Sequence, residues 1–168
     1  MVLGGASSGK SSYAEKLVTG LDKPRVYVAT AQAFDVEMRT KIEDHKRARG
    51  PDWRTIEAPL ELPAALDTVL PDEVVLIDCL TLWLSNLILA EAPVATATDR
   101  LLAAIGACAA PVVVVSNEVG AGIVPENALA RRFRSAQGRL NQQVAARADC
   151  VVTVMAGLPL ALKGSLPE

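Results

Sequence analysis

The sequence predicts an α/β fold in which helices flank a mostly parallel β-sheet. Short apolar runs alternate along the chain with segments of helical periodicity, an order typical of this fold class. The 168 residues are 51% hydrophobic but only 4% aromatic, so Ala, Val and Leu have to fill the core, as in parallel sheets covered by helices. No linker, internal repeat or low-complexity segment divides the chain, and we expect one domain over residues 1–168.

The order of strands and helices follows from these runs. The first strand, residues 1–3, is a short apolar run, and helix 11–19 follows it with apolar pairs at helical spacing and Gly20 near its end. Strands are further expected at 25–30, 54–57, 74–78, 112–116 and 150–155, helices at 35–49, 60–69, 80–90 and 98–109, and a surface loop at 93–98. The last helix, 126–148, is the clearest, because Leu129, Phe133, Ala136, Leu140 and Val144 form an apolar stripe.

A complete phosphate-binding loop stands between the first strand and the first helix. It fits the pattern G-x-x-x-x-G-K-[ST], in which glycines let successive N–H groups point at the phosphates. We expect Lys10 to reach the β- and γ-phosphates and the Ser11 hydroxyl to ligate Mg²⁺. The sequence therefore predicts nucleoside triphosphate binding in a fold like that of the P-loop NTPases. The loop consists of Gly4, Gly5, Ala6, Ser7, Ser8, Gly9, Lys10 and Ser11.

Two later strands end on acidic or amide side chains, where open α/β sheets place their ligands. Asp78 follows four aliphatic residues, as in a Walker B strand, and is expected to hold Mg²⁺ directly or through water. The alternative is that Asp78 helps to cap the following helix. Asn117 and Glu118 follow Ser116 in the same way, but this signal is weaker, because both residues could simply begin a turn.

Charge and composition exclude several classes of partner. The net charge of −2 and the pI near 5.5 argue against a nucleic-acid partner, which usually requires a basic excess. The apolar segment 74–90 is short for a membrane span and contains four polar residues. The three cysteines are odd in number and far apart, so we expect reduced thiols and a cytoplasmic protein. The start of the chain also lacks the pattern of a secretory signal.

His45 is the single histidine and lies in the expected helix 35–49. Met38, Ile42, His45 and Arg49 share one helical face, so His45 should point toward the protein or a cleft. It is either a hydrogen-bonded, partly buried side chain or a nucleophile or acid/base near neutral pH. The basic residues beside it would then screen phosphate charge, or they form a solvated helix end.

Six segments, in this order, resemble one known family. They are GGASSGKSSYAE at 4–15, YVATA at 27–31, MRTKIEDHKRARGPDWRTIE at 38–57, LIDCLT at 76–81, SNEVGAGIVP at 116–125 and FRSAQGRLNQ at 133–142. Together they resemble the bifunctional adenosylcobinamide kinase/adenosylcobinamide-phosphate guanylyltransferase of cobalamin biosynthesis, over essentially the whole chain. Many families share the phosphate loop, whereas the segment from His45 to Glu57 and the SNEVG stretch are more specific.

The resemblance implies two reactions and a set of site residues. Adenosylcobinamide is phosphorylated by ATP or GTP, and GMP from GTP then passes through a covalent adduct to adenosylcobinamide phosphate. His45 matches the histidine that takes up GMP, and family members are similar in forming a homotrimer. Relatives usually have a few more residues before the loop, so the first strand is short here. Besides the phosphate loop, the implied nucleotide-site residues are Ala29, Thr30, Ala31, Lys46, Arg47, Ala48, Arg49, Glu57 and Asp78.

Two other functions remain open at this point. A phosphate-loop kinase for another metabolite would use Lys10, Ser11 and Asp78 and leave His45 structural. A nucleotide-binding regulator would hydrolyse slowly and respond through moving loops. Only the transferase interpretation requires a nucleotide bonded covalently to the protein.

Overall fold

A computed structural model describes residues 1–32 and 50–167 of the chain. In this part of the chain seven strands form one sheet with the order β3-β2-β4-β5-β1-β6-β7. Strands β1 to β6 pair in parallel, and β7 pairs antiparallel with β6. The predicted mostly parallel α/β sheet is therefore confirmed. The strands are β1 (Val2–Gly4), β2 (Arg25–Ala29), β3 (Trp53–Glu57), β4 (Val74–Asp78), β5 (Val112–Asn117), β6 (Val151–Met155) and β7 (Leu158–Lys163).

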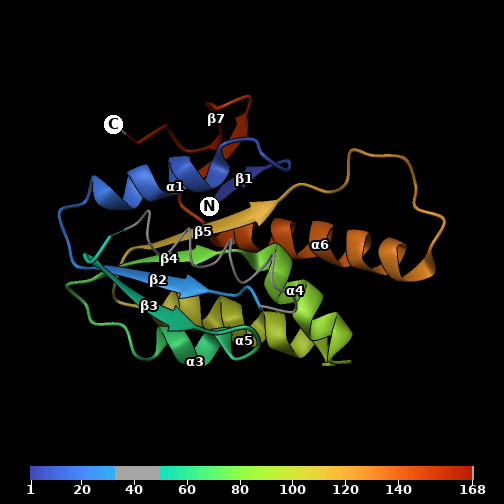
Figure 1. Cartoon of the computed structure of the whole chain (residues 1–168), viewed down its shortest axis with the longest axis horizontal. Helices are drawn as coiled ribbons and strands as arrows, with labels where there is room; N and C mark the ends of the chain where they lie inside the picture. The colour runs from blue at the N-terminus through green and yellow to red at the C-terminus, as the bar shows by residue number, and fades with distance from the viewer. Residues whose placement is uncertain (33–49, 168) are drawn as a thin grey trace.

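Helices cover both faces of the sheet (Figure 1). On one face α1 packs with Val2, Leu76 and Val115 in one core cluster. On the other face, side chains of the remaining helices pack with Val28 and Ile77 in a second cluster, which contains the fully buried Trp83. The sheet thus separates two apolar layers. The helices are α1 (Lys10–Thr19), α3 (Leu62–Leu66), α4 (Leu80–Leu89), α5 (Val94–Ala107) and α6 (Ala128–Arg147).

The expected elements differ from the structure at some ends. Helix α5 already begins at Val94, so the prediction of a surface loop at 93–98 is wrong. Pro93 caps that helix, a place where its missing N–H removes no helical hydrogen bond. Helix α3 is shorter than expected, with Pro63 in its first turn. Leu129 of the predicted apolar stripe is exposed. The expected helix 35–49 lies outside the described residues.

Strand β7 is absent from the sequence-based prediction. It follows β6 through a two-residue turn, in which Ala156 and Gly157 both have positive φ, 52° and 79°, as tight hairpins require. Every second residue of this edge strand, from its first position on, is an exposed leucine: Leu158, Leu160 and Leu162. A period of two in apolar residues after a glycine turn is the signal that would have predicted it.

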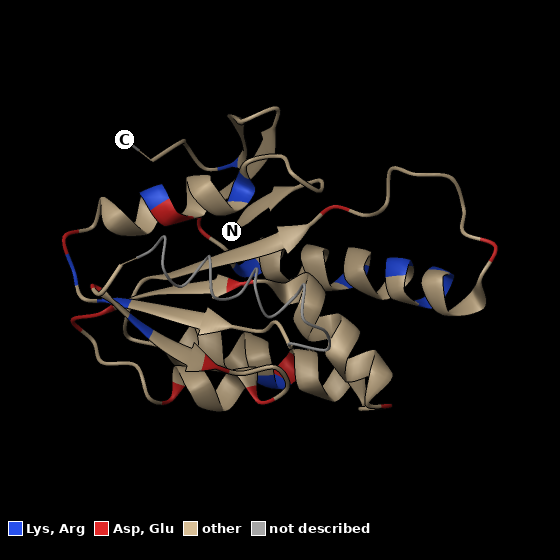
Figure 2. Ribbon diagram, viewed as in Figure 1, with Lys and Arg blue, Asp and Glu red and all other residues tan. Residues whose placement is uncertain are grey.

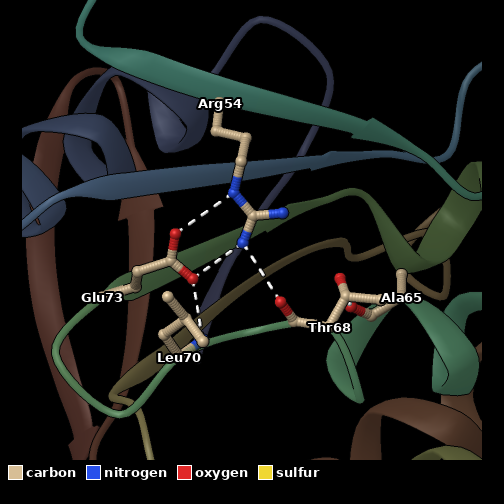
Figure 3. Close-up of polar contacts among 5 residues, drawn as sticks. All are labelled: Arg54, Ala65, Thr68, Leu70 and Glu73. Carbon is tan, nitrogen blue, oxygen red and sulfur yellow. Dashed lines mark hydrogen bonds and ion pairs between the residues drawn. The ribbon is translucent and has the colours of Figure 1, made fainter.

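A partly buried ion pair joins the buried Glu73, just before β4, to the exposed Arg54 of β3 (Figure 3). The Arg54 guanidinium donates to both Glu73 oxygens, at 3.1 and 2.7 Å, and the Leu70 N–H donates to Glu73 at 2.8 Å. Burial alone would raise the pKa of Glu73, but these hydrogen bonds and the Arg54 charge outweigh it and lower the pKa. Glu73 is therefore ionised in its buried position at neutral pH.

Candidate nucleotide site

The phosphate loop connects the end of β1 to the first turn of α1. Ser7 and Gly9 have positive φ, 54° and 91°, and Gly9 is the N-cap of α1 without a side-chain cap. No acidic residue stands in the first turn of α1. Because the first N–H groups of a helix have no partner within the helix, this end is suited to bind an anion. The loop therefore has the backbone shape and the donors that a triphosphate requires.

Close packing fixes the loop against β6 and the β6–β7 turn. A side chain on Gly4 would place its Cβ 2.4 Å from Ser8 Oγ and 2.7 Å from the Val154 carbonyl oxygen. The Gly157 N–H donates to the Ser8 carbonyl at 2.9 Å, so the unpredicted hairpin supports the loop. Lys10 Nζ donates to the Gly5 carbonyl at 3.1 Å, which keeps the ammonium group over the loop.

Register and side-chain alternation bring other expected residues to the same edge and face. Ala29 is in register with Glu57 and with Asp78. Their side chains lie on the α1 face, because Trp53, Tyr27 and Leu76, each an even number of residues earlier in its strand, pack in the α1-side core. Glu57 is exposed and Asp78 is half-buried. Two carboxylates thus lie on the face that carries the phosphate loop, at the carboxyl ends of the strands.

The donor set at this edge fits Mg²⁺. The hydroxyl of Ser11, in the first turn of α1, and the carboxylate of Asp78 are both oxygen donors, which Mg²⁺ prefers. The neighbouring Cys79 does not compete as a thiolate. Burial raises the pKa of its thiol, and the charge of Asp78 raises it further.

Thr30 has a different position from the other expected nucleotide-site residues. Its side chain is fully buried, and its hydroxyl accepts from the Cys79 N–H at 2.8 Å and donates to the Cys79 carbonyl at 2.7 Å. Asn86 Nδ2 donates to the Thr30 carbonyl at 2.8 Å. Thr30 thus joins the end of β2 to the residue directly after Asp78, while its neighbour Ala31 is half-exposed.

Five expected site residues lie outside the described part of the chain. They are His45, Lys46, Arg47, Ala48 and Arg49.

A polar network behind the end of β5 escaped the sequence-based analysis. Ser116 and Gln137 both donate to Asn141 Oδ1, at 2.7 and 3.0 Å, and Gln137 also donates to Ser116 Oγ at 2.9 Å. All three side chains are buried. The sequence signal that could have predicted this network is the pair Gln137 and Asn141, which lie four residues apart beside the apolar stripe of α6.

The segment after β5 is held to α6 by arginines. Arg131 donates to the carbonyls of Pro125 and Glu126, and Arg134 donates to those of Gly120 and Ile123. Figure 2 marks the basic residues along α6 in blue and shows the long connection that leads from β5 to the start of this helix. Two arginines thus fix a connection that contains the exposed Ile123.

A cavity of about 530 Å³ lies elsewhere in the molecule. Its lining includes Met1, Val112 and Cys150, at the amino ends of β1, β5 and β6. The phosphate loop follows the opposite, carboxyl end of β1, so this cavity does not belong to the nucleotide site.

No helix in the described ranges is long and apolar enough to cross a membrane.

Comparison with known proteins decides between the open functions. The sequence model of the family described as cobinamide kinase / cobinamide phosphate guanyltransferase matches residues 1–162. The chain belongs to this family. The resemblance found in the sequence is thereby confirmed, and with it the expectation of an enzyme that has a kinase and a guanylyltransferase activity.

Individual relatives agree with the family assignment over nearly their full length. The chain is 43% identical to the bifunctional adenosylcobalamin biosynthesis protein CobP of Pseudomonas aeruginosa, over 98% of this chain and 96% of that protein. It is 42% identical to the bifunctional adenosylcobalamin biosynthesis protein CobU of Salmonella typhimurium, over 97% and 98%. The protein of the same name from Escherichia coli is 40% identical over 97% and 98%. Among solved structures, the RadB recombinase is similar at 17% identity and a TM-score of 0.46, covering 90% of this chain and 71% of that one.

Proposed function

We propose that this enzyme phosphorylates adenosylcobinamide and then transfers GMP from GTP, through a covalent adduct on His45, to give adenosylcobinamide-GDP in adenosylcobalamin biosynthesis. The observation that carries the proposal is the phosphate loop on the same face and edge of the sheet as Asp78 and Glu57, in a chain of this family. The role of His45 rests on its sequence motif and on the resemblance.

The kinase step needs positioning more than covalent chemistry. The hydroxyl of the aminopropanol arm attacks the γ-phosphorus of ATP or GTP, a new O–P bond forms, and the bond to the β-phosphate oxygen breaks. Lys10 and the N–H groups of the loop hold the phosphates and neutralise their charge. Ser11 and Asp78 would hold Mg²⁺, which supplies further charge neutralisation.

The guanylyl transfer divides one substitution into two. His45 attacks the α-phosphorus of GTP, pyrophosphate leaves, and a histidine–GMP phosphoramidate forms. A phosphate oxygen of adenosylcobinamide phosphate then attacks the same phosphorus, and His45 leaves as the neutral imidazole after protonation. Such a covalent intermediate replaces one difficult step by two easier ones. Lys46, Arg47, Ala48, Arg49 and Glu57 line the nucleotide in this proposal, together with Ala29 and Ala31, while the fully buried Thr30 fixes the end of β2.

We also propose a homotrimer in the cytoplasm. The trimer rests on the family resemblance alone. The cytoplasmic location is supported by Cys79, Cys108 and Cys150, which are all free thiols in the structure.

Labelling with GTP tests the covalent step directly. Label at the α-phosphate should remain on the wild-type protein, and label at the γ-phosphate should not. The adduct should be lost in acid and survive alkali, as a phosphoramidate does. His45→Ala should abolish labelling and guanylyl transfer but retain part of the kinase turnover, which needs no protein nucleophile. Full labelling of His45→Ala would contradict the proposal.

Lys10→Ala tests the role of the phosphate loop in GTP binding. It should weaken GTP binding and reduce both half-reactions with the fold preserved, because the Lys10 ammonium makes only one exposed hydrogen bond in the described part of the chain. Titration calorimetry measures the affinity for GTP. An unchanged affinity would remove the loop from the mechanism.

A further inference from the structure

The motif Ser116-Asn117-Glu118 has no role in the reactions above. Strand β5 lies between β1, which leads into the phosphate loop, and β4, which ends at Asp78. Asn117 is in register with Gly4, and the Glu118 N–H donates to the Gly4 carbonyl at 3.1 Å. The Asn117 side chain lies on the α1 face, because Val113 and Val115 of the same strand pack in the α1-side core. Asn117 therefore stands between the phosphate loop and Asp78.

Side chains from two other elements fix the backbone of Asn117. Its N–H donates to Thr81 Oγ1 of α4 at 2.8 Å, and its carbonyl accepts from Asn141 Nδ2 of α6 at 3.0 Å. Asn141 is itself oriented by Ser116 and Gln137. A functional side chain is held in place in this way when supporting residues lock its own position.

The carboxamide oxygen of Asn117 is buried, yet no described residue donates a hydrogen bond to it. Most buried polar atoms in native proteins have a partner, and an exception calls for an explanation such as a catalytic role or an absent water or ion. Ser8 Oγ in the phosphate loop is a second buried oxygen without a partner among the described residues. Both residues lie beside Gly4. Asn117 is in register with Gly4, and a Cβ on Gly4 would lie 2.4 Å from Ser8 Oγ. Of the four buried side-chain polar atoms without a partner among the described residues, Ser8 Oγ and Asn117 Oδ1 thus lie where the phosphate loop leaves the sheet, whereas Arg25 Nε and Gln137 Oε1 lie elsewhere.

We infer that Asn117 is a substrate-contacting residue of the nucleotide site, whose carboxamide oxygen accepts a hydrogen bond from an O–H group that arrives with the substrates. The inference rests on the proposed function. A carboxamide oxygen only accepts, so its partner is not a bare phosphate oxygen. Two sources supply such an O–H group here, the waters of a magnesium ion held by Ser11 and Asp78 and the hydroxyl that is phosphorylated.

Asn117→Leu tests the inference, because leucine has a similar size and no polar atom. The backbone bonds to Thr81 and Asn141 remain possible. The unfolding midpoint of the nucleotide-free protein should not fall, since the carboxamide oxygen has no described partner to lose. The kcat/KM of the kinase step should fall about tenfold, as expected for one lost hydrogen bond to substrate. If leucine prevents folding, Asn117→Ala carries the same expectation.

Two measurements separate the sources of the O–H group. The first is titration of Mg²⁺ in the presence of a non-hydrolysable GTP analogue, which requires no turnover. The second is the KM of the kinase step for adenosylcobinamide. Weaker Mg²⁺ binding by Asn117→Leu would assign the partner to the waters of the metal. Unchanged Mg²⁺ binding with a raised KM for adenosylcobinamide would assign it to the acceptor hydroxyl.

Ser116→Ala is the matched control, because Ser116 adjoins Asn117 but bonds to α6 on the other face. It should lower the unfolding midpoint, because it removes two buried hydrogen bonds to α6. Two outcomes contradict the inference, provided that Lys10→Ala still weakens binding of the analogue. In one, Asn117→Leu loses as much stability as Ser116→Ala. In the other, Asn117→Leu keeps the wild-type kcat/KM and Mg²⁺ affinity. If Lys10→Ala also binds the analogue like wild type, the proposed function itself fails.

Discussion

The hydroxyl of Thr30 is the link between β2 and the residue after Asp78, and Thr30→Val removes that link at nearly constant shape. The hydroxyl accepts from the Cys79 N–H and donates to the Cys79 carbonyl. After the substitution the carbonyl still accepts from the Trp83 N–H at 3.2 Å. The N–H of Cys79, whose residue is 7% exposed, loses its hydroxyl partner in the interior. The two hydrogen bonds therefore contribute unequally.

The expected loss of stability follows from these contacts. A buried donor left unsatisfied costs about 1–3 kcal/mol, and the loss of the second hydrogen bond adds about 0.5–1.5 kcal/mol. We expect Thr30→Val to lower the free energy of unfolding by about 2–4 kcal/mol. For a chain of this size that corresponds to a fall of about 5–15 °C in Tm. Because Cys79 follows Asp78 directly, the variant should also need more Mg²⁺ for activity.

Urea and thermal unfolding of matched variants provide the assay. Thr30→Ser retains the hydroxyl and should lose much less stability than Thr30→Val. Thr19→Val is the control for the chemistry of the substitution, since Thr19 Oγ1 donates to the Lys16 carbonyl at 3.0 Å on the exposed side of α1. It should remain within about 0.5 kcal/mol of wild type. A Thr30→Val protein as stable as Thr19→Val would refute the reasoning.

Three further predictions concern the ion pair, the loop and the magnesium site. Glu73→Gln should destabilise the protein by about 1–3 kcal/mol at pH 7. The folded-state pKa of Glu73 lies below its ordinary value of 4.5, so this difference should persist above pH 4.5 and shrink in unfolding measurements as the pH falls through the lowered pKa. Gly4→Ala should lose about 1–3 kcal/mol and weaken GTP binding in calorimetry, because its Cβ meets backbone at 2.7 Å. Gly138→Ala, with open space around its Cβ in α6, should instead gain about 1 kcal/mol, and equal effects would refute the packing argument. Asp78→Asn should raise the Mg²⁺ concentration needed for activity, and a profile that overlays wild type would exclude Asp78 as a magnesium ligand.

The family resemblance and the phosphate loop could both be recognised in the sequence, because each is encoded in contiguous residues. A loop of this kind depends on glycines at fixed positions and on the N–H groups of the helix directly after it. The buried strands were predictable for a similar reason, since uninterrupted runs such as 74–77 fit a sheet covered on both faces. Helix ends were less predictable, as at Val94, because a proline such as Pro93 fits a turn as well as the position just before a helix.

Local sequence by itself determined that a triphosphate loop joins a strand to a helix and that Asp78 ends an apolar strand. Only the tertiary structure decided that Thr30 is bonded to Cys79, 49 residues away, and that Asn117 lies between the loop and Asp78. It also decided that β7 closes one edge of the sheet beside β6. The physical reason is that strand order and register arise from burial of both faces and from hydrogen bonds between distant segments, which no local pattern specifies.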